Sequence, residues 1–184
     1  MATMITHPII PLVLGCSLGL RVISVRLLSV ACVASILPDF DIIAFQFDIP
    51  YASDYGHRGF THSITFAVMV GMVGILFHRA LRCNRWIGFS LLFIATVSHG
   101  ILDALTNGGL GIAFYWPLDS TRYFFPWQPL EVSPIGIRRF LSGRGFEVVR
   151  SEFLWVWLPL FTLGLLMYAM RRRFQRSSPS STGT

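Results

Sequence analysis

The chain has 184 residues, of which 53% are hydrophobic and only 13% are charged. An average soluble domain carries about 25% charged residues, and a mean hydropathy of +0.61 leaves too little polar surface to cover a water-soluble core. This composition excludes an ordinary soluble domain and predicts an all-α, polytopic membrane protein. We expect one membrane-embedded domain over residues 1–176 and a Ser-rich, disordered tail over residues 177–184.

The net charge of +6 comes from 15 arginines and nine acidic residues. The arginines form no single stripe, so nucleic acid is not an expected partner. The expected partner is the lipid bilayer. Three cysteines, two of them in apolar stretches, imply no disulfide framework.

Segments 60–77, 86–105 and 153–170 are apolar and, as helices, would each be about 27 to 30 Å long, which matches the hydrocarbon thickness. Segments 8–20 and 27–37 are shorter, and Arg21 and Arg26 lie between them. We expect a helical hairpin that turns near these two arginines. One long tilted helix is the alternative, but it would bury both charges at a cost of several kcal/mol. The hairpin gives about five transmembrane helices in total.

The charges separate along this five-helix chain. If the C-terminal arginines lie in the cytoplasm, the segments that join the first two helices and the next two also lie there, and this side carries nine arginines and no acid. All nine acidic residues fall on the other side. The N-terminus and loops 38–58 and 106–152 should therefore face the exterior, and the C-terminus should face the cytoplasm.

Four of the five histidines and three aspartates map to predicted outer helix ends, whereas His78 maps to the inner side. Ionisable groups in membrane helices are costly and usually functional, and imidazole with carboxylate is a ligand set for Zn, Mn or Fe. The candidate metal ligands are His7, Asp39, Asp41, His57, His62, His99 and Asp103.

His99 and Asp103 are four residues apart in an apolar helix, so both side chains lie on one face and can bind one metal or bridge two. A His–Asp hydrogen bond that joins two helices is the alternative. Asp39 and Asp41 end the second short helix, where Pro38 disrupts the helix and frees the two carboxylates from a strand-like alternation.

Residues 56–63 read Gly-His-Arg-Gly-Phe-Thr-His-Ser. Gly56 and Gly59 permit unusual backbone turns, and the guanidinium of Arg58 could hold an anionic oxygen. An interfacial helix start with polar side chains reaching toward water is the alternative interpretation.

This ordered set of motifs resembles the YdjM family of inner-membrane, metal-dependent hydrolases over roughly residues 6–130. The matching blocks are Thr6-His7, residues 37–41, residues 57–63, Ser98-His99 with Asp103, and Trp116-Pro117. The family is similar in its His/Asp arrangement to zinc-dependent phospholipase C and the P1-type nucleases. The resemblance implies a bacterial inner-membrane location and makes the seven candidate residues metal ligands or their hydrogen-bond partners. Seven groups exceed the ligand count of one catalytic zinc, so we expect two or three divalent ions, zinc before Mn or Fe.

We therefore expect a metal-activated water to hydrolyse a phosphate ester, with a phospholipid as a candidate substrate. Arg58 would stabilise negative charge, and Asp39 or Asp41 would act as general base. The aromatic loop 108–151 is either an interfacial belt or a lid; as a lid, it would supply Arg122 as a phosphate contact. The alternatives are a metal-ion or proton-coupled transporter and a non-enzymatic protein with a structural metal site. Oligomeric state is not predicted.

Overall fold

A computed structural model describes residues 1–134, 136–141 and 143–177. Among these residues the only β-structure is two isolated bridges, which confirms the all-α prediction. The expected tail lies outside the described residues, apart from Ser177. The elements are α1 (Ile9–Leu18), α2 (Val25–Ile36), η1 (Leu37–Phe47), η2 (Phe60–His62), α3 (Ile64–Leu76), α4 (Arg85–Ala104), α5 (Ile137–Phe140), α6 (Gly143–Glu152), η3 (Phe153–Trp157) and α7 (Leu158–Ser177).

Three helical stretches are long and apolar enough to cross a membrane: Val25–Phe47, Arg85–Ala104 and Gly143–Phe174. Helices α1 and α3 are apolar but shorter, with 10 and 13 residues. The helix expected from residue 60 begins at Ile64 instead, because the Ser63 side chain caps it by accepting a hydrogen bond from Phe66 N. The last helix extends further than expected, since α6, η3 and α7 run on from Gly143.

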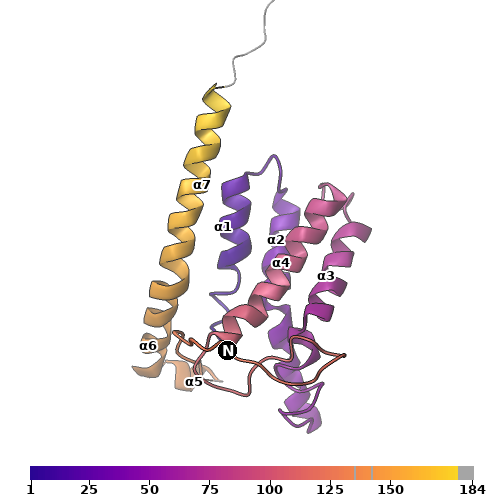
Figure 1. Cartoon of the computed structure of the whole chain (residues 1–184), viewed down its shortest axis with the longest axis vertical. Coiled ribbons are helices and arrows are strands. Elements are labelled where there is room, and N and C mark those ends of the chain that lie inside the picture. The colour runs from indigo at the N-terminus through magenta and orange to yellow at the C-terminus, as the bar shows by residue number, and fades with distance from the viewer. Residues whose placement is uncertain (135, 142, 178–184) are drawn as a thin grey trace, which may run out of the picture.

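The expected N-terminal hairpin is confirmed. Helix α1 ends before Gly19, whose φ of +86° suits glycine, and α2 starts after Ser24, whose side chain accepts a hydrogen bond from Leu27 N. The two helices then run in opposite directions (Figure 1). Arg21 and Arg26 lie at the turn with exposed side chains.

The bundle has two ends (Figure 1), and the sequence gives them different charged residues. We call one the arginine end: it comprises turns 19–24 and 77–84 and the C-terminal part of α7. The other, the acidic end, comprises the N-terminal segment, η1, the loop 48–59, η2, the last turns of α4, the loop 105–134, α5 and α6. The predicted separation of acids from arginines therefore holds for the eight of these nine arginines whose side chains the structure describes. Which end faces the cytoplasm stays a prediction.

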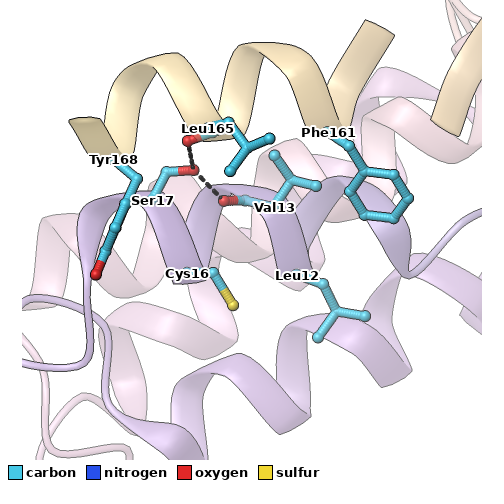
Figure 2. Close-up of a pocket in the computed structure, with 8 residues that line it drawn as sticks. Leu12, Val13, Cys16, Ser17, Phe161, Leu165 and Tyr168 are labelled. Carbon is cyan, nitrogen blue, oxygen red and sulfur yellow. Dashed lines mark hydrogen bonds between the residues drawn. The ribbon is translucent and has the colours of Figure 1, made fainter. Parts of the chain in front are cut away.

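Helix α4 is the central helix of the bundle. Its close neighbour is α3, and α2 packs on it through a core that includes Leu27, Ala31, Leu92 and Ala95. Helix α7 packs mainly on α1, where Ser17 donates to the carbonyl oxygens of Val13 and Gly164 (Figure 2). Most of α7 is exposed in this structure, as expected of a helix that faces lipid.

Most of the expected 108–151 loop folds over the acidic end, although its last part forms α5 and α6. The loop is attached to the start of α3, where Ile64 N donates to Phe114 O and Thr65 Oγ1 donates to Trp116 O. It therefore lies next to the loop 48–59 and η2, and it restricts access to the candidate site from that side.

Candidate metal centre

Five of the seven predicted ligands come together at the acidic end. Asp39 comes from the first turn of η1, His62 from the end of η2, and His99 and Asp103 from the last turns of α4. His7 precedes α1 and stacks on His99, with ring centroids 3.7 Å apart. All five side chains are at most 1% exposed. Elements distant in sequence thus build one buried polar cluster.

Asp39, His62, His99 and Asp103 each offer one ligand atom, and these atoms lie within 4.8 Å of one another. His99 Nε2 is 3.1 Å from His62 Nε2 and 3.3 Å from Asp39 Oδ1. His62 Nε2 is 3.7 Å from Asp103 Oδ2. A tetrahedral zinc with ligand bonds of about 2.0 to 2.2 Å would hold its ligand atoms about 3.3 to 3.6 Å apart. The four atoms are therefore close to the spacing that one such ion requires.

The cluster leaves several buried polar atoms without a hydrogen-bond partner. Both carboxylate oxygens of Asp39, both ring nitrogens of His7 and Oδ2 of Asp103 belong to this set. Buried polar atoms are normally paired, and a buried charge without partners is costly. Divalent cations would satisfy these carboxylate oxygens and the one ring nitrogen of His7 that carries a lone pair, so the donor set fits a metal.

The two central histidines are oriented by hydrogen bonds on their far nitrogens. His99 Nδ1 donates to the Ser35 carbonyl at 2.7 Å, and His62 Nδ1 lies 3.2 Å from a carboxylate oxygen of Asp41. These contacts direct Nε2 of each ring at the cluster as the candidate ligand atom. Metal-binding histidines are typically held in this way.

Asp41 lies beside the cluster as a hydrogen-bond acceptor. Its oxygens accept from His57 Nδ1 at 2.6 Å, from Arg58 N at 3.1 Å and from Thr61 Oγ1 at 2.7 Å, in addition to the contact with His62. Asp41, His57 and His62 form a second group close enough to hold an ion. The hydrogen bonds already occupy both oxygens, however, so Asp39 is the better candidate ligand of the two aspartates.

The glycines of the 56–63 motif make this arrangement possible. A Cβ on Gly59 would lie 2.1 Å from the carbonyl oxygen of Asp54, which only glycine avoids. Arg58 adopts a φ of +67°, an uncommon conformation for a residue with a Cβ. This tight turn, which the glycine pattern suggested, places Arg58 and His62 against Asp41 and Asp103.

Arg58 is fully buried, and its guanidinium faces protein atoms. Nε lies 3.4 Å from Asp103 Oδ2, Nη1 donates to Gly108 O, and Nη2 donates to Thr106 Oγ1. The arginine therefore balances the charge of Asp103 and holds the 106–108 loop. A direct contact with a substrate anion stays a prediction.

Arg122 lies outside the cluster. Its guanidinium donates to the carbonyl oxygens of Tyr51, Ser53 and His57, so it fixes the 51–57 loop. These three contacts use both terminal nitrogens, and the predicted phosphate contact gains no support from them.

Burial sets the charge of His7. Complete burial, together with the neighbouring His99, lowers the pKa of His7 to about 3, so its imidazole is neutral at pH 7 and can bind a metal. Burial alone would also lower the pKa of His62, but hydrogen bonds to Asp103 and Asp41 outweigh it and raise this pKa to about 9. A metal that binds His62 Nε2 would displace that proton.

Sequence reasoning missed a second polar cluster next to the first. Glu152 is fully buried and accepts hydrogen bonds from Thr3 N, Thr3 Oγ1 and Thr6 Oγ1 at 2.5 to 2.7 Å. Ala2 N donates to Asp103 Oδ1 at 2.7 Å. The N-terminal segment is thereby fixed against the candidate centre. A single acid directly before the apolar 153–170 segment was the signal that could have identified Glu152.

His78 lies at the arginine end, as predicted, and lines a cavity together with three arginines. Its Nδ1 contacts the Ile75 carbonyl. It takes no part in the cluster.

The ordered polar motifs and the membrane helices that carry them agree with comparisons to known proteins. The chain matches the YdjM inner membrane protein family over residues 1–175. It belongs to the YdjM inner membrane protein family. The match extends the resemblance drawn from residues 6–130 to nearly the whole chain.

A curated relative of this YdjM-family chain is the inner membrane protein YbcI of Escherichia coli (strain K12). The two are 39% identical over 176 residues, which cover 93% of this chain and 100% of the relative. No solved structure matches the chain. The family and the relative are both described as inner membrane proteins, which agrees with the predicted membrane.

Proposed function

We propose that this YdjM-family protein is a membrane-bound, metal-dependent hydrolase that acts on a phosphate ester. The observation that carries the proposal is the buried His/Asp cluster, in which both oxygens of Asp39, one of Asp103 and the ring nitrogens of His7 lack hydrogen-bond partners. A polar cluster of this kind is too costly for a membrane helix bundle unless it binds something. Its ligands would be His7, Asp39, His62, His99 and Asp103.

The arrangement supports more than one ion. Asp39 Oδ1 faces His62 and His99, whereas its Oδ2 lies 3.9 Å from His7 Nε2. Asp103 is similar: Oδ2 is near His62, and Oδ1 lies 3.9 Å from His7 Nε2. Asp39 and Asp103 would therefore be available to ions on both the His62 side and the His7 side of the cluster. Zinc is the expected metal, with manganese or iron as alternatives.

Bound divalent ions would polarise a phosphoryl oxygen and lower the pKa of a water molecule toward neutrality. Residues of the protein itself would make the other contributions to catalysis. Arg58 keeps a fixed positive charge beside Asp103 in a site that excludes water, where it counters negative charge most effectively. Asp41 keeps His57 and His62 in position. The general base stays a prediction, because Asp39 is used here as a ligand and both oxygens of Asp41 already accept hydrogen bonds.

The position of the cluster at one end of the bundle favours a substrate that reaches it from the membrane interface, such as a phospholipid. The phosphoester assignment rests on the resemblance to zinc-dependent phospholipase C. Because the ligands are at most 1% exposed, substrate access requires the 105–134 loop or the N-terminal segment to move.

That burial also favours a second candidate, a structural metal site in a non-enzymatic membrane protein. A structural site has a closed coordination sphere with no position for water. Both candidates bind a metal, but only the hydrolase keeps a position for water and turns over a substrate.

The test uses purified protein in detergent, assayed for zinc, manganese and iron content and for cleavage of a chromogenic phosphodiester, a phosphomonoester and a phospholipid. We expect chelation to abolish cleavage and zinc to restore it. Asp103→Asn should lower the cleavage activity by more than the 10- to 100-fold that is typical of changes next to a ligand. The matched control His78→Gln should keep full activity. Cleavage of only an amide or carboxylic ester would contradict the phosphoester assignment. A metal-loaded protein inert toward every substrate would favour the structural site.

A further inference from the structure

The arginine end contains a cavity that the metal centre does not use. Its volume is about 560 Å³, and it lies between the turn that joins α1 to α2 and the turn that joins α3 to α4. Its lining includes Arg21, Arg79, Arg82 and His78. A concentration of positive charge around a cavity indicates an anionic ligand.

The three arginines are not neutralised by the protein. Their side chains are exposed, and among the described residues no ion pair or hydrogen bond engages their guanidinium groups. The chain has no acidic residue before Asp39 and none between residues 55 and 102. Three like charges around one cavity repel each other, and an anion would relieve that repulsion.

The cavity is built on a fixed backbone. The Ser24 hydroxyl donates to the Leu81 carbonyl, and Arg26 Nη1 donates to the Ala80 carbonyl at 3.1 Å, so the two turns are tied together. Within the second turn, Cys83 N donates to the His78 carbonyl at 3.1 Å. The arginine side chains therefore project from a preorganised frame.

Arg82 adopts a φ of +52°, in the left-handed region where glycine or asparagine is less strained. Backbone strain of this kind persists where the surrounding structure or the function requires it. At this position it directs an arginine toward the cavity that Arg79 also lines.

An apolar groove of about 300 Å³ continues from this cavity along the bundle between α1 and α4. The cavity and the groove share Val22 and Ile87. Beyond these two residues the lining of the groove includes Leu14, Leu18, Trp86, Ser90, Leu91 and Ile94. A positively charged cavity thus opens into an apolar channel that faces the hydrocarbon.

We propose that this continuous site binds one anionic phospholipid. The phosphate headgroup occupies the cavity at Arg21, Arg79 and Arg82, and an acyl chain lies in the groove along Ser90 and Leu91. Charge complementarity selects the headgroup, since basic pockets between membrane helices bind anionic lipid headgroups. The apolar groove separates this ligand from a free phosphate, which would leave the groove without an occupant.

The test measures lipid retention by native mass spectrometry of delipidated full-length protein in detergent. The probes are phosphatidylglycerol and phosphatidylcholine with the same acyl chains. We expect a clear preference for phosphatidylglycerol. Arg79→Gln with Arg82→Gln should weaken its binding on the order of 25-fold, about fivefold for each arginine. The matched control, Arg172→Gln with Arg173→Gln, removes two charges from the same end outside the cavity and should change binding less than about threefold on the same scale.

Ser90→Trp fills the groove without altering an arginine, so it should weaken the binding of phosphatidylglycerol. Inorganic phosphate should not displace this lipid from the protein. Equal binding of the two lipids, or an equal loss in the Arg172/Arg173 control, would overturn the proposal. Displacement by inorganic phosphate with no effect of Ser90→Trp would also overturn it, because the site would then bind a free anion. Metal content and the far-UV circular dichroism spectrum identify any variant that fails to fold, and Leu18→Trp at the groove then replaces Ser90→Trp.

Discussion

Asp39 and Asp41 are two residues apart, yet the structure gives them opposite environments, and this contrast can be tested. Asp39 makes no hydrogen bond through either oxygen and faces His62 and His99. Asp41 accepts from the side chains or backbone of four residues in the 57–62 segment. Asp39→Asn should therefore remove a metal ligand, whereas Asp41→Asn should remove a structural support.

The magnitudes follow from these contacts. Asp41→Asn replaces one carboxylate oxygen, which accepts hydrogen bonds, with an amide NH2 group that faces N–H and O–H donors. At least two charged hydrogen bonds are therefore lost, at about 1.5 to 3 kcal/mol each. The metal-free protein should lose about 3 kcal/mol or more of stability, and metal affinity should fall about 10- to 100-fold. Asp39→Asn breaks no hydrogen bond, so it should change the stability of the metal-free protein by less than the ~1 kcal/mol of one hydrogen bond while abolishing stoichiometric metal.

The assay combines elemental analysis of each purified variant with thermal unfolding of chelator-treated protein in detergent. Circular dichroism monitors the unfolding. The expected pattern is lost metal with retained stability for Asp39→Asn, and weakened metal with lowered stability for Asp41→Asn. If Asp41→Asn loses all metal while Asp39→Asn keeps it, the roles assigned here are reversed and the second group, with His57, is the true centre.

Two further predictions concern the metal and the topology. His62→Ala and His99→Ala should each lose bound metal, because both Nε2 atoms face the cluster; His78→Ala, at the other end of the fold, should keep its full metal content by elemental analysis. Reporters fused at residue 80 should show that this residue lies in the cytoplasm, because the arginine end should face inward. A reporter that places residue 80 outside would put the metal centre at the cytoplasmic face.

Local patterns predicted much of the fold and of the site. The hairpin followed from two arginines between short apolar segments, and the juxtaposition of His99 and Asp103 followed from helical spacing. The unusual turn at 56–59 followed from its two glycines. Each of these signals depends on neighbours within a few residues, which a sequence displays directly.

The distinct roles of Asp39 and Asp41 could not be predicted in this way. Both lie in η1, a 3-10 helix with about three residues per turn, so side chains two positions apart point about 120° apart around the axis. Sequence reasoning expected Pro38 to break the helix and left both carboxylates as candidates. Glu152 was missed for another reason: its partners lie 146 to 149 residues away, and only tertiary packing brings them together.

The depth of the cluster bears on the choice between hydrolysis and transport. Transport sites lie near the middle of the bilayer, between broken helices, and must be reachable from both sides. Here His99 and Asp103 occupy the last turns of α4, and Asp39 lies in the first turn of η1. His7 and His62 precede α1 and α3. The opposite half of α4 packs apolar residues such as Leu91 and Leu92 against α2, with no described acid or histidine to carry an ion onward. A buried site at one end of the bundle, with no described polar residues leading to the other end, suits chemistry at the interface better than passage across the membrane. The separate arginine end can then hold the protein in an anionic bilayer without entering the reaction.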